Sequence, residues 1–250
     1  MRPIVTLLTD FGTSDGYVAE MKGVLLTEVP GVTLVDVTHE IPPHDVEGGR
    51  LTLARYWRRF PPGTVHVAVV DPGVGGARDA LAVASDGRFL VGPDNGVLSP
   101  ALLATGVRVA RLPIPPRAAP TFHGRDVFAP AAARLALGGA LESLGPPVHD
   151  PIVRRTPEPR RLADGGVEGM VIAVDRFGNA ITNLLTQGRG EILVAGRALP
   201  LLRTYAEVAP GAPVALVGSN GLVEIAVREG SAERVLGLRR GERVEWRGRA

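Results

Sequence analysis

The chain has 250 residues, 45% of them hydrophobic and 22% charged, a composition that predicts a folded protein of one large or two modest domains. The absence of cysteine excludes disulfides, thiol catalysis and cysteine zinc sites, and no apolar run reaches the roughly 18 to 20 residues of a membrane span. A net charge of +2, scattered arginines and 4% aromatic residues do not favour nucleic-acid binding, and without a signal-like N-terminus we expect a cytoplasmic protein.

The first third of the chain alternates strand and helix patterns. We expect buried strands at residues 3–9, 32–37 and 65–70, and helices at residues 16–29 and 45–60. Ser14 or Asp15 is expected to cap the first helix. This alternation is typical of a parallel sheet with right-handed crossovers.

Shorter elements follow. The Asp86-Gly87 pair predicts a hairpin. The expected elements are strands at residues 80–84, 88–91 and 107–112, a short helix from residue 97, and an alanine-rich helix at residues 127–137. Residues 144–164 are rich in proline and arginine without periodicity, which indicates a linker.

After the linker the pattern changes to short β-like runs separated by glycine turns, at residues 169–174, 180–184, 191–194, 214–217, 223–227 and 243–246. No helix of convincing length is expected among them. The sequence therefore predicts an α/β protein: a three-layer N-terminal domain with a parallel-rich sheet (residues 1–158) and a smaller all-β barrel (residues 165–250).

Three aspartates, Asp10, Asp71 and Asp94, come directly after predicted strands in glycine-rich turns. In an open α/β sheet, the carboxyl ends of the strands are where ligands bind. Arg78 follows Asp71 by seven residues, and His123 precedes a helix. A carboxylate, an arginine and a histidine together can position and deprotonate a water, although loop aspartates often only close turns.

Other motifs are weaker. Four histidines, His39, His44, His66 and His149, show no ligand spacing and are interpreted as ordinary surface or core residues. Residues 73–76 lack the third glycine of a dinucleotide fingerprint, and there is no phosphate loop or nucleophile elbow. No cofactor and no metal are therefore expected, while a metal site of Asp10, Asp71 and His123 stays open as an alternative.

Six turns resemble one family in their order and spacing. They are residues 9–15 (TDFGTSD), 70–75 (VDPGVG), 92–96 (GPDNG), 121–126 (TFHGRD), 175–179 (DRFGN) and 219–221 (SNG). Each is weak alone, and the last two also suit plain hairpin turns. Together they resemble the S-adenosyl-L-methionine hydrolase (hydroxide adenosyltransferase) family, relatives of the fluorinase and chlorinase enzymes, over essentially the whole chain.

The resemblance implies hydrolysis of S-adenosylmethionine to adenosine and L-methionine by water or hydroxide attacking the ribose C5′. It implies a homotrimer, with substrate between one subunit's N-terminal domain and a neighbour's barrel. Asp71, Arg78 and His123 would hold and polarise the water. The implied substrate-binding residues are Asp10 for the ribose hydroxyls, Asp175 and Asn179 for the methionine end, and Asp71, Ser219, Glu224 and the backbone near Val227.

Residue 71 distinguishes the branches of the family. The halogenating members carry an aromatic residue where this chain has Asp71, and a carboxylate repels a halide. Water is therefore the expected nucleophile. A halide-using adenosyltransferase, a metal-dependent hydrolase and a non-catalytic adenosine or S-adenosylmethionine sensor are the alternatives.

Overall fold

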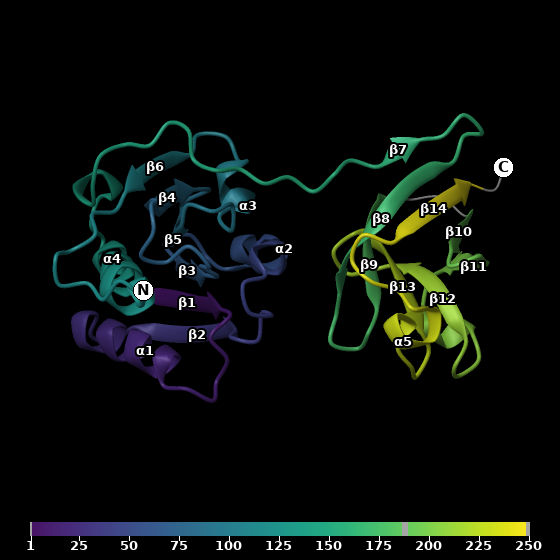
Figure 1. Cartoon of the computed structure of the whole chain (residues 1–250), viewed down its shortest axis with the longest axis horizontal. Coiled ribbons are helices and arrows are strands. Elements are labelled where there is room, and N and C mark those ends of the chain that lie inside the picture. Colours follow the sequence, from purple (N-terminus) through teal and green to yellow (C-terminus); the bar gives the residue numbers. More distant parts are fainter. Residues whose placement is uncertain (1, 187–189, 249–250) are drawn as a thin grey trace. The chain divides into compact units, whose positions relative to one another are not determined.

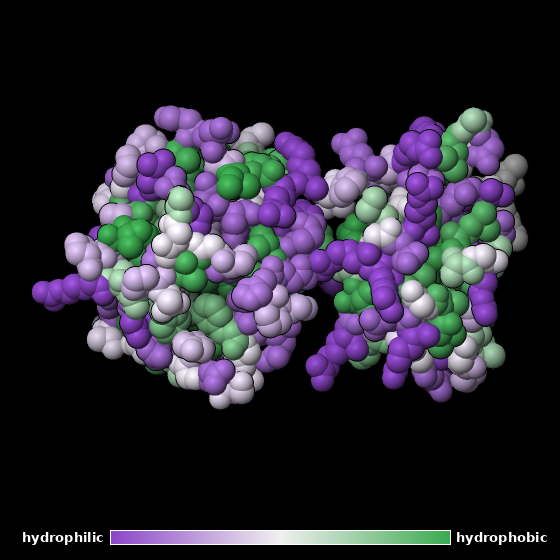
Figure 2. Space-filling model, in the orientation of Figure 1, coloured by the Kyte–Doolittle hydropathy of each residue, from purple (hydrophilic) through white to green (hydrophobic). Residues whose placement is uncertain are grey.

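A computed structural model describes residues 2–186 and 190–248, which divide into two compact units, Met1–Arg155 and Thr156–Ala250 (Figure 1). Polar side chains cover most of the visible face of each unit, and the apolar residues among them form small patches (Figure 2). Within the described residues, no helix has the length and apolar character needed to cross a membrane.

The first unit is built on a mixed sheet. In the described residues its strands are β1 (Ile4–Thr9), β2 (Thr33–Thr38), β3 (Val65–Val69), β4 (Ala80–Ser85), β5 (Arg88–Pro93) and β6 (Arg108–Arg111), in the order β2-β1-β3-β5-β4-β6. The pairs β2–β1, β1–β3 and β3–β5 are parallel, whereas β4 is antiparallel to β5 and β6. The predicted hairpin is confirmed, with Asp86 and Gly87 both at positive φ (47° and 70°).

Helices cover both faces of this sheet, as the predicted three-layer domain requires. They are α1 (Tyr17–Glu28), α2 (Val46–Tyr56), α3 (Ser99–Leu102) and α4 (Ala129–Ala136), with 3₁₀ turns at Trp57–Arg59 and Leu141–Ser143 and a π-helical turn at Gly124–Phe128. Side chains alternate between two apolar clusters: Leu7 of β1 packs in the cluster of α1 and α4, and Leu8 in the cluster of α2 and α3. Strands buried on both faces in this way read as continuous apolar runs.

Two local expectations are wrong. The residue capping α1 is Gly16, with no side-chain hydrogen bond, so neither Ser14 nor Asp15 caps it. The expected helix over residues 45–60 is α2 followed by the 3₁₀ turn, because the chain tightens at Trp57. Asp45 does cap α2, since its side chain accepts from the Gly48 N–H.

The second unit is the predicted β-barrel. Its described strands are β7 (Arg160–Arg161), β8 (Val167–Val174), β9 (Ala180–Leu185), β10 (Gly190–Val194), β11 (Arg197–Leu202), β12 (Pro213–Val217), β13 (Leu222–Val227) and β14 (Arg243–Gly248). Seven of these described strands follow the order β14-β10-β11-β12-β13-β9-β8, and the β14–β8 pairing closes the barrel; β7 is a short addition to β8. The sequence missed β11, which contains Pro200, and the short helix α5 (Ala232–Leu236).

The predicted linker is ordered over its first part. Pro147 forms a bridge to Ala110 of β6, and the Ile152 N–H donates to the Asp94 carboxylate at 2.8 Å. Arg154 donates its N–H to the Ser99 hydroxyl at 2.8 Å. These contacts fasten the segment to the first unit, up to the division after Arg155.

Candidate active site

The turn after β3 carries the first of the predicted catalytic residues. Val65 to Val70 are buried, and the chain emerges at Asp71 into a turn in which the Val74 N–H bonds the Asp71 carbonyl. Gly75 lies at φ +74°, and a Cβ there would meet the Pro120 carbonyl oxygen at 2.4 Å. Only glycine lets this turn approach the segment that leads to His123.

Arg78 joins the other two predicted catalytic residues. Its Nε donates to Asp71 Oδ1 at 3.0 Å, and its Nη2 donates to Asp71 Oδ2 in a second, shorter hydrogen bond. The same Nη2 lies 2.8 Å from His123 Nδ1. The side chains of Arg78 and Asp71 are only 10% and 4% exposed, and the guanidinium lies 5.5 Å from the Phe128 ring centroid. The expected association of Asp71, Arg78 and His123 is thus present in the structure.

The contacts assign the proton on His123. A guanidinium only donates, so Nδ1 must accept, and the neutral ring then carries its proton on Nε2. Burial, followed by the Arg78 charge, lowers the pKa of His123 below its ordinary value, which keeps the ring neutral near pH 7. Nε2 makes no hydrogen bond within the described residues, so it remains a donor for another molecule.

Asp10 and Asp94 share the sheet edge with Asp71, as predicted, because β1, β3 and β5 are parallel. Their side chains have separate partners: Asp10 Oδ2 accepts from the His44 N–H at 2.8 Å, and Asp94 Oδ1 accepts from Ile152. Burial raises the pKa of Asp94. The described residues contain no cluster of three or more histidine and acidic side chains that could hold a metal ion.

Asn95, in the turn after β5, was not anticipated. Its amide Nδ2 donates to the Val70 carbonyl at 2.8 Å, and its Oδ1 accepts from the Val97 N–H at 3.1 Å. The amide therefore holds the peptide bond immediately before Asp71. The sequence singles out Asp94 in the Gly-Pro-Asp-Asn-Gly turn, whereas its neighbour Asn95 contacts the strand end that leads to Asp71.

In the barrel, Asp175 and Asn179 form one compact turn. Asp175 Oδ1 accepts from the backbone N–H groups of Phe177 and Asn179, both at 2.9 Å, and its Oδ2 accepts from the Asn179 side chain at 3.0 Å. Gly178 is at φ +81° with Ser231 Oγ 2.0 Å from where its Cβ would be. Both residues are therefore placed together, and Phe177 between them is 76% exposed.

The remaining predicted barrel residues lie around β13. Glu224 Oε1 accepts from the Tyr205 hydroxyl at 2.7 Å, Ser219 is exposed in the turn before β13, and Val227 is buried at its end. The sequence did not indicate Tyr205, which lies in a 3₁₀ turn (Tyr205–Glu207). Burial and then the bond to Glu224 raise the pKa of Tyr205 to about 12, so its hydroxyl stays a donor.

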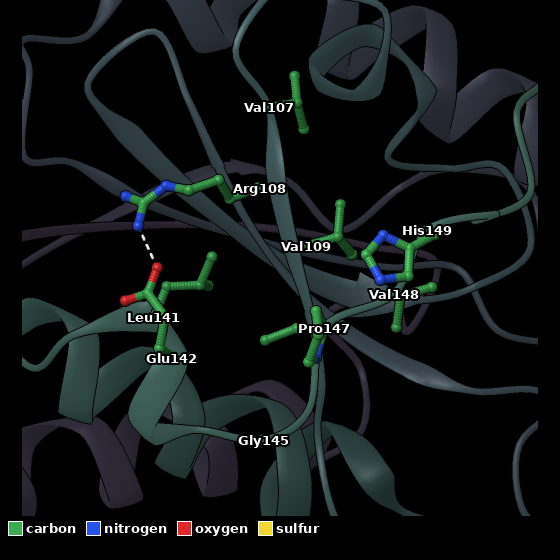
Figure 3. A pocket seen from close by; sticks show the side chains of 10 residues that line it. Val107, Arg108, Val109, Leu141, Glu142, Gly145, Pro147, Val148 and His149 are labelled. Atoms are coloured by element: carbon green, nitrogen blue, oxygen red, sulfur yellow. Dashed lines mark hydrogen bonds and ion pairs between the residues drawn. The ribbon is translucent and has the colours of Figure 1, made fainter.

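A separate cavity of about 390 Å³ opens at the outer edge of β6 (Figure 3). Val107, Val109 and Pro147 point toward it, with the Arg108–Glu142 ion pair on one side and His149 on the other. It shares no residue with the Asp71–Arg78–His123 cluster.

The protein is thus a two-domain α/β protein: an α/β domain is followed by a β-barrel. The α/β domain has a buried carboxylate–guanidinium–imidazole cluster at its strand ends. The sequence matches the SAM hydroxide adenosyltransferase N-terminal domain over residues 5–145 and the C-terminal domain of that family over residues 169–245. The chain belongs to the SAM hydroxide adenosyltransferase family.

Three relatives with assigned names are similar in sequence to this chain over nearly its full length. An (R)-S-adenosyl-L-methionine hydrolase of Thermus thermophilus is 48% identical, covering 96% of this chain and 98% of the relative. The hydrolase of Salinispora tropica is 42% identical, with 97% of each chain covered, and a fluorinase of Nocardia brasiliensis is 32% identical, covering 98% and 96%.

Two solved structures share the fold. The crystal structure of a conserved hypothetical protein from Thermus thermophilus superposes with a TM-score of 0.83 at 46% identity, covering 99% of this chain and 100% of that chain. An uncharacterized conserved protein from Thermotoga maritima gives a TM-score of 0.88 at 31% identity, covering 97% and 99%.

Proposed function

We propose that this protein hydrolyses (R)-S-adenosyl-L-methionine to adenosine and L-methionine. The hydrogen-bonded cluster of Asp71, Arg78 and His123 carries the proposal, because it offers a nucleophilic water both an acceptor and a donor. The hydrolase names of relatives 48% and 42% identical to this chain support the same substrate and the (R) configuration.

The donors and acceptors of the cluster assign its roles. A carboxylate has about four lone-pair positions, and Arg78 occupies two on Asp71, so the others are open to a water O–H. The His123 Nε2–H is suited to donate to the same water's oxygen. Arg78 bonds both the carboxylate and the imidazole, so His123 is connected to Asp71 through Arg78.

In the proposed step, the water oxygen bonds to the ribose C5′ while the C5′–sulfur bond breaks. The electron pair of that bond goes to sulfur, which leaves as the neutral thioether of methionine. The water's proton passes to Asp71 and then to solvent. The sulfonium needs no acid to leave, so alignment of the water and exclusion of competing water are the main tasks.

We assign substrate binding as the family resemblance implies. Asp10 takes the ribose hydroxyls, Asp175 and Asn179 take the methionine end, and Ser219, Glu224 and the Val227 backbone line the rest. A homotrimer with sites formed between one subunit's first domain and a neighbour's barrel, and a cytoplasmic location, stay predictions. Analytical ultracentrifugation and cell fractionation test them.

The deciding experiment is incubation with (R)-S-adenosyl-L-methionine, followed by chromatography, with and without added chloride. Adenosine as the sole nucleoside product supports the proposal. A chlorinated nucleoside would assign the chain to the halogenating branch, and the absence of any product would favour a sensor. Activity that survives prolonged chelator treatment removes the metal-dependent alternative.

A further inference from the structure

A chain of side-chain hydrogen bonds connects α1, β2 and the end of β1. Lys22 Nζ donates to Asp36 Oδ2 at 2.5 Å, and Asp36 Oδ1 lies 3.0 Å from His39 Nε2. His39 Nδ1 lies 2.8 Å from the Thr9 hydroxyl, which accepts from the Phe11 N–H at 3.2 Å. The last two residues in this series of hydrogen bonds, Thr9 and Phe11, are the sequence neighbours of Asp10.

The Asp36 carboxylate sets the direction of the bonds that a neutral His39 ring makes in this chain. The Asp36 carboxylate only accepts, so the Nε2 atom of a neutral His39 ring carries the ring proton and donates it to Oδ1. Nδ1 of that neutral ring then accepts the proton of the Thr9 hydroxyl, whose oxygen also accepts from the Phe11 N–H. This arrangement satisfies all the partners together.

Two further bonds tie the same turns through the backbone. The Gly12 N–H donates to the His39 carbonyl at 2.8 Å, and the His44 N–H donates to Asp10 Oδ2 at 2.8 Å. His44 adopts φ +69°, a left-handed conformation that costs a non-glycine residue energy. The strain presents an N–H to Asp10, and the Asp10 Oδ1 atom has no hydrogen-bond partner in the described part of the chain.

The order carboxylate, imidazole, hydroxyl is that of a nucleophile-activating triad, but burial excludes this role. Thr9, which would be the nucleophile, is 0% exposed, so no substrate reaches its hydroxyl. Burial raises the pKa of Asp36, but the bonds from Lys22 and His39 outweigh it and leave the pKa below its ordinary value. The ionised Asp36 therefore holds His39 in place.

We propose that His39 is a positioning residue for the reaction: through Thr9 and its own carbonyl it fixes the turn that aims Asp10 at the ribose hydroxyls of the substrate. This inference rests on the proposed function, which assigns those hydroxyls to Asp10. It gives Lys22, the only lysine in the sequence, a part in the same support.

Binding of adenosine and of 2′,3′-dideoxyadenosine to the full-length protein, measured by calorimetry, tests it. The variants are His39→Gln, whose amide nitrogen replaces Nε2 but offers Thr9 no acceptor, and His39→Asn, whose amide oxygen can replace Nδ1. Asp10→Asn is the reference for loss of the hydroxyl contact. His149→Gln, at the distant β6 cavity, is the matched control.

We expect His39→Gln to weaken adenosine binding about threefold to tenfold while leaving 2′,3′-dideoxyadenosine within twofold of the unsubstituted protein. Asp10→Asn should show the same selective loss, and His39→Asn should retain most of the preference for adenosine. Melting curves recorded for each variant separate loss of folded protein from loss of affinity.

Equal weakening of both nucleosides in His39→Gln, or no weakening of either, would overturn the proposal when Asp10→Asn does lose the preference. An Asp10→Asn variant that keeps the full preference for adenosine would overturn it too, by removing the ribose role of Asp10. Turnover of (R)-S-adenosyl-L-methionine by the unsubstituted protein is measured in the same preparations, and it reports on the hydrolase function independently.

Discussion

The Asp71→Asn substitution tests the centre of the proposed mechanism. It leaves the shape of the side chain nearly unchanged but replaces one acceptor oxygen by an N–H₂ group, which then faces an N–H of Arg78. One hydrogen bond of the bidentate pair is lost, and the guanidinium, with a 10% exposed side chain, is left without its counter-charge.

The structure sets the size of both effects. Breaking a buried ion pair by removing one partner typically costs about 3–5 kcal/mol, so Asp71→Asn should lower the free energy of unfolding by several kcal/mol. Loss of the proton acceptor should lower kcat/KM for (R)-S-adenosyl-L-methionine by about 100-fold or more, the usual contribution of a general base. Urea unfolding and chromatographic adenosine formation measure the two quantities.

Two controls separate stability from chemistry. The Asp71→Asn/Arg78→Met double variant removes the unpaired cation and should regain part of the lost stability without regaining activity. Arg108→Met breaks the ion pair to Glu142, in which both side chains are 61% exposed, and should cost less than about 1 kcal/mol with full turnover. Near-normal turnover by Asp71→Asn, or a stability loss as small as that of Arg108→Met, would refute the reasoning.

Three further outcomes follow from the same geometry. Because burial lowers the pKa of His123, hydrolysis should be level from pH 8 to about 6.5 and fall at lower pH as the ring is protonated against Arg78; a fall on the alkaline side of 6.5 would contradict this. Burial and then the Arg88 charge lower the pKa of His66 to about 4. As the pH falls, the unfolded chain therefore binds the proton before the folded chain does. About 3 kcal/mol of the free energy of unfolding, fully present above pH 6.5, should be lost by about pH 4. Urea titrations should show a distinctly steeper loss of stability between pH 6.5 and 4 in the unsubstituted protein than in His66→Phe, and equal slopes would contradict the assignment to His66. Gly75→Ala should lower the melting temperature well beyond Gly106→Ala, which has a similar φ but open space around its Cβ, and equal losses would exclude the contact with Pro120 as the cause.

The sequence predicted the parts of the fold that depend on local pattern. Continuous apolar runs located β1 and β3, and the Asp86-Gly87 pair located the β4–β5 hairpin. β11 was not predicted because Pro200 interrupts its β-strand pattern, and α5 was not predicted because it is only five residues long. These elements are determined by tertiary pairing more than by their own residues.

The sequence indicated which residues form the candidate site, but it did not indicate the hydrogen bonds that connect them. The seven-residue spacing of Asp71 and Arg78 suggested a pair, and the two side chains do bond. The contact of Arg78 with His123 depends on the close approach of Gly75 to Pro120, which no local pattern reveals. The sequence predicts His39 and His66 to be surface or core residues; both are core residues, and the sequence does not reveal that each bonds a threonine. Strand register brings Thr6 opposite His66, and register is not readable from either strand alone.

Arg78 has a consequence for the choice of nucleophile. Since it donates to both Asp71 and His123, every remaining position on the Asp71 carboxylate is an acceptor. A water satisfies such a position with its own O–H, whereas a halide has no proton to donate to it and is repelled by the carboxylate charge. Exchanging Asp71 alone for an aromatic residue would remove the repulsion of a halide, but it would also leave the Arg78 guanidinium buried and unpaired, which lowers the stability of the protein. A stable variant without the Asp71 carboxylate is therefore expected to need a change at Arg78 as well.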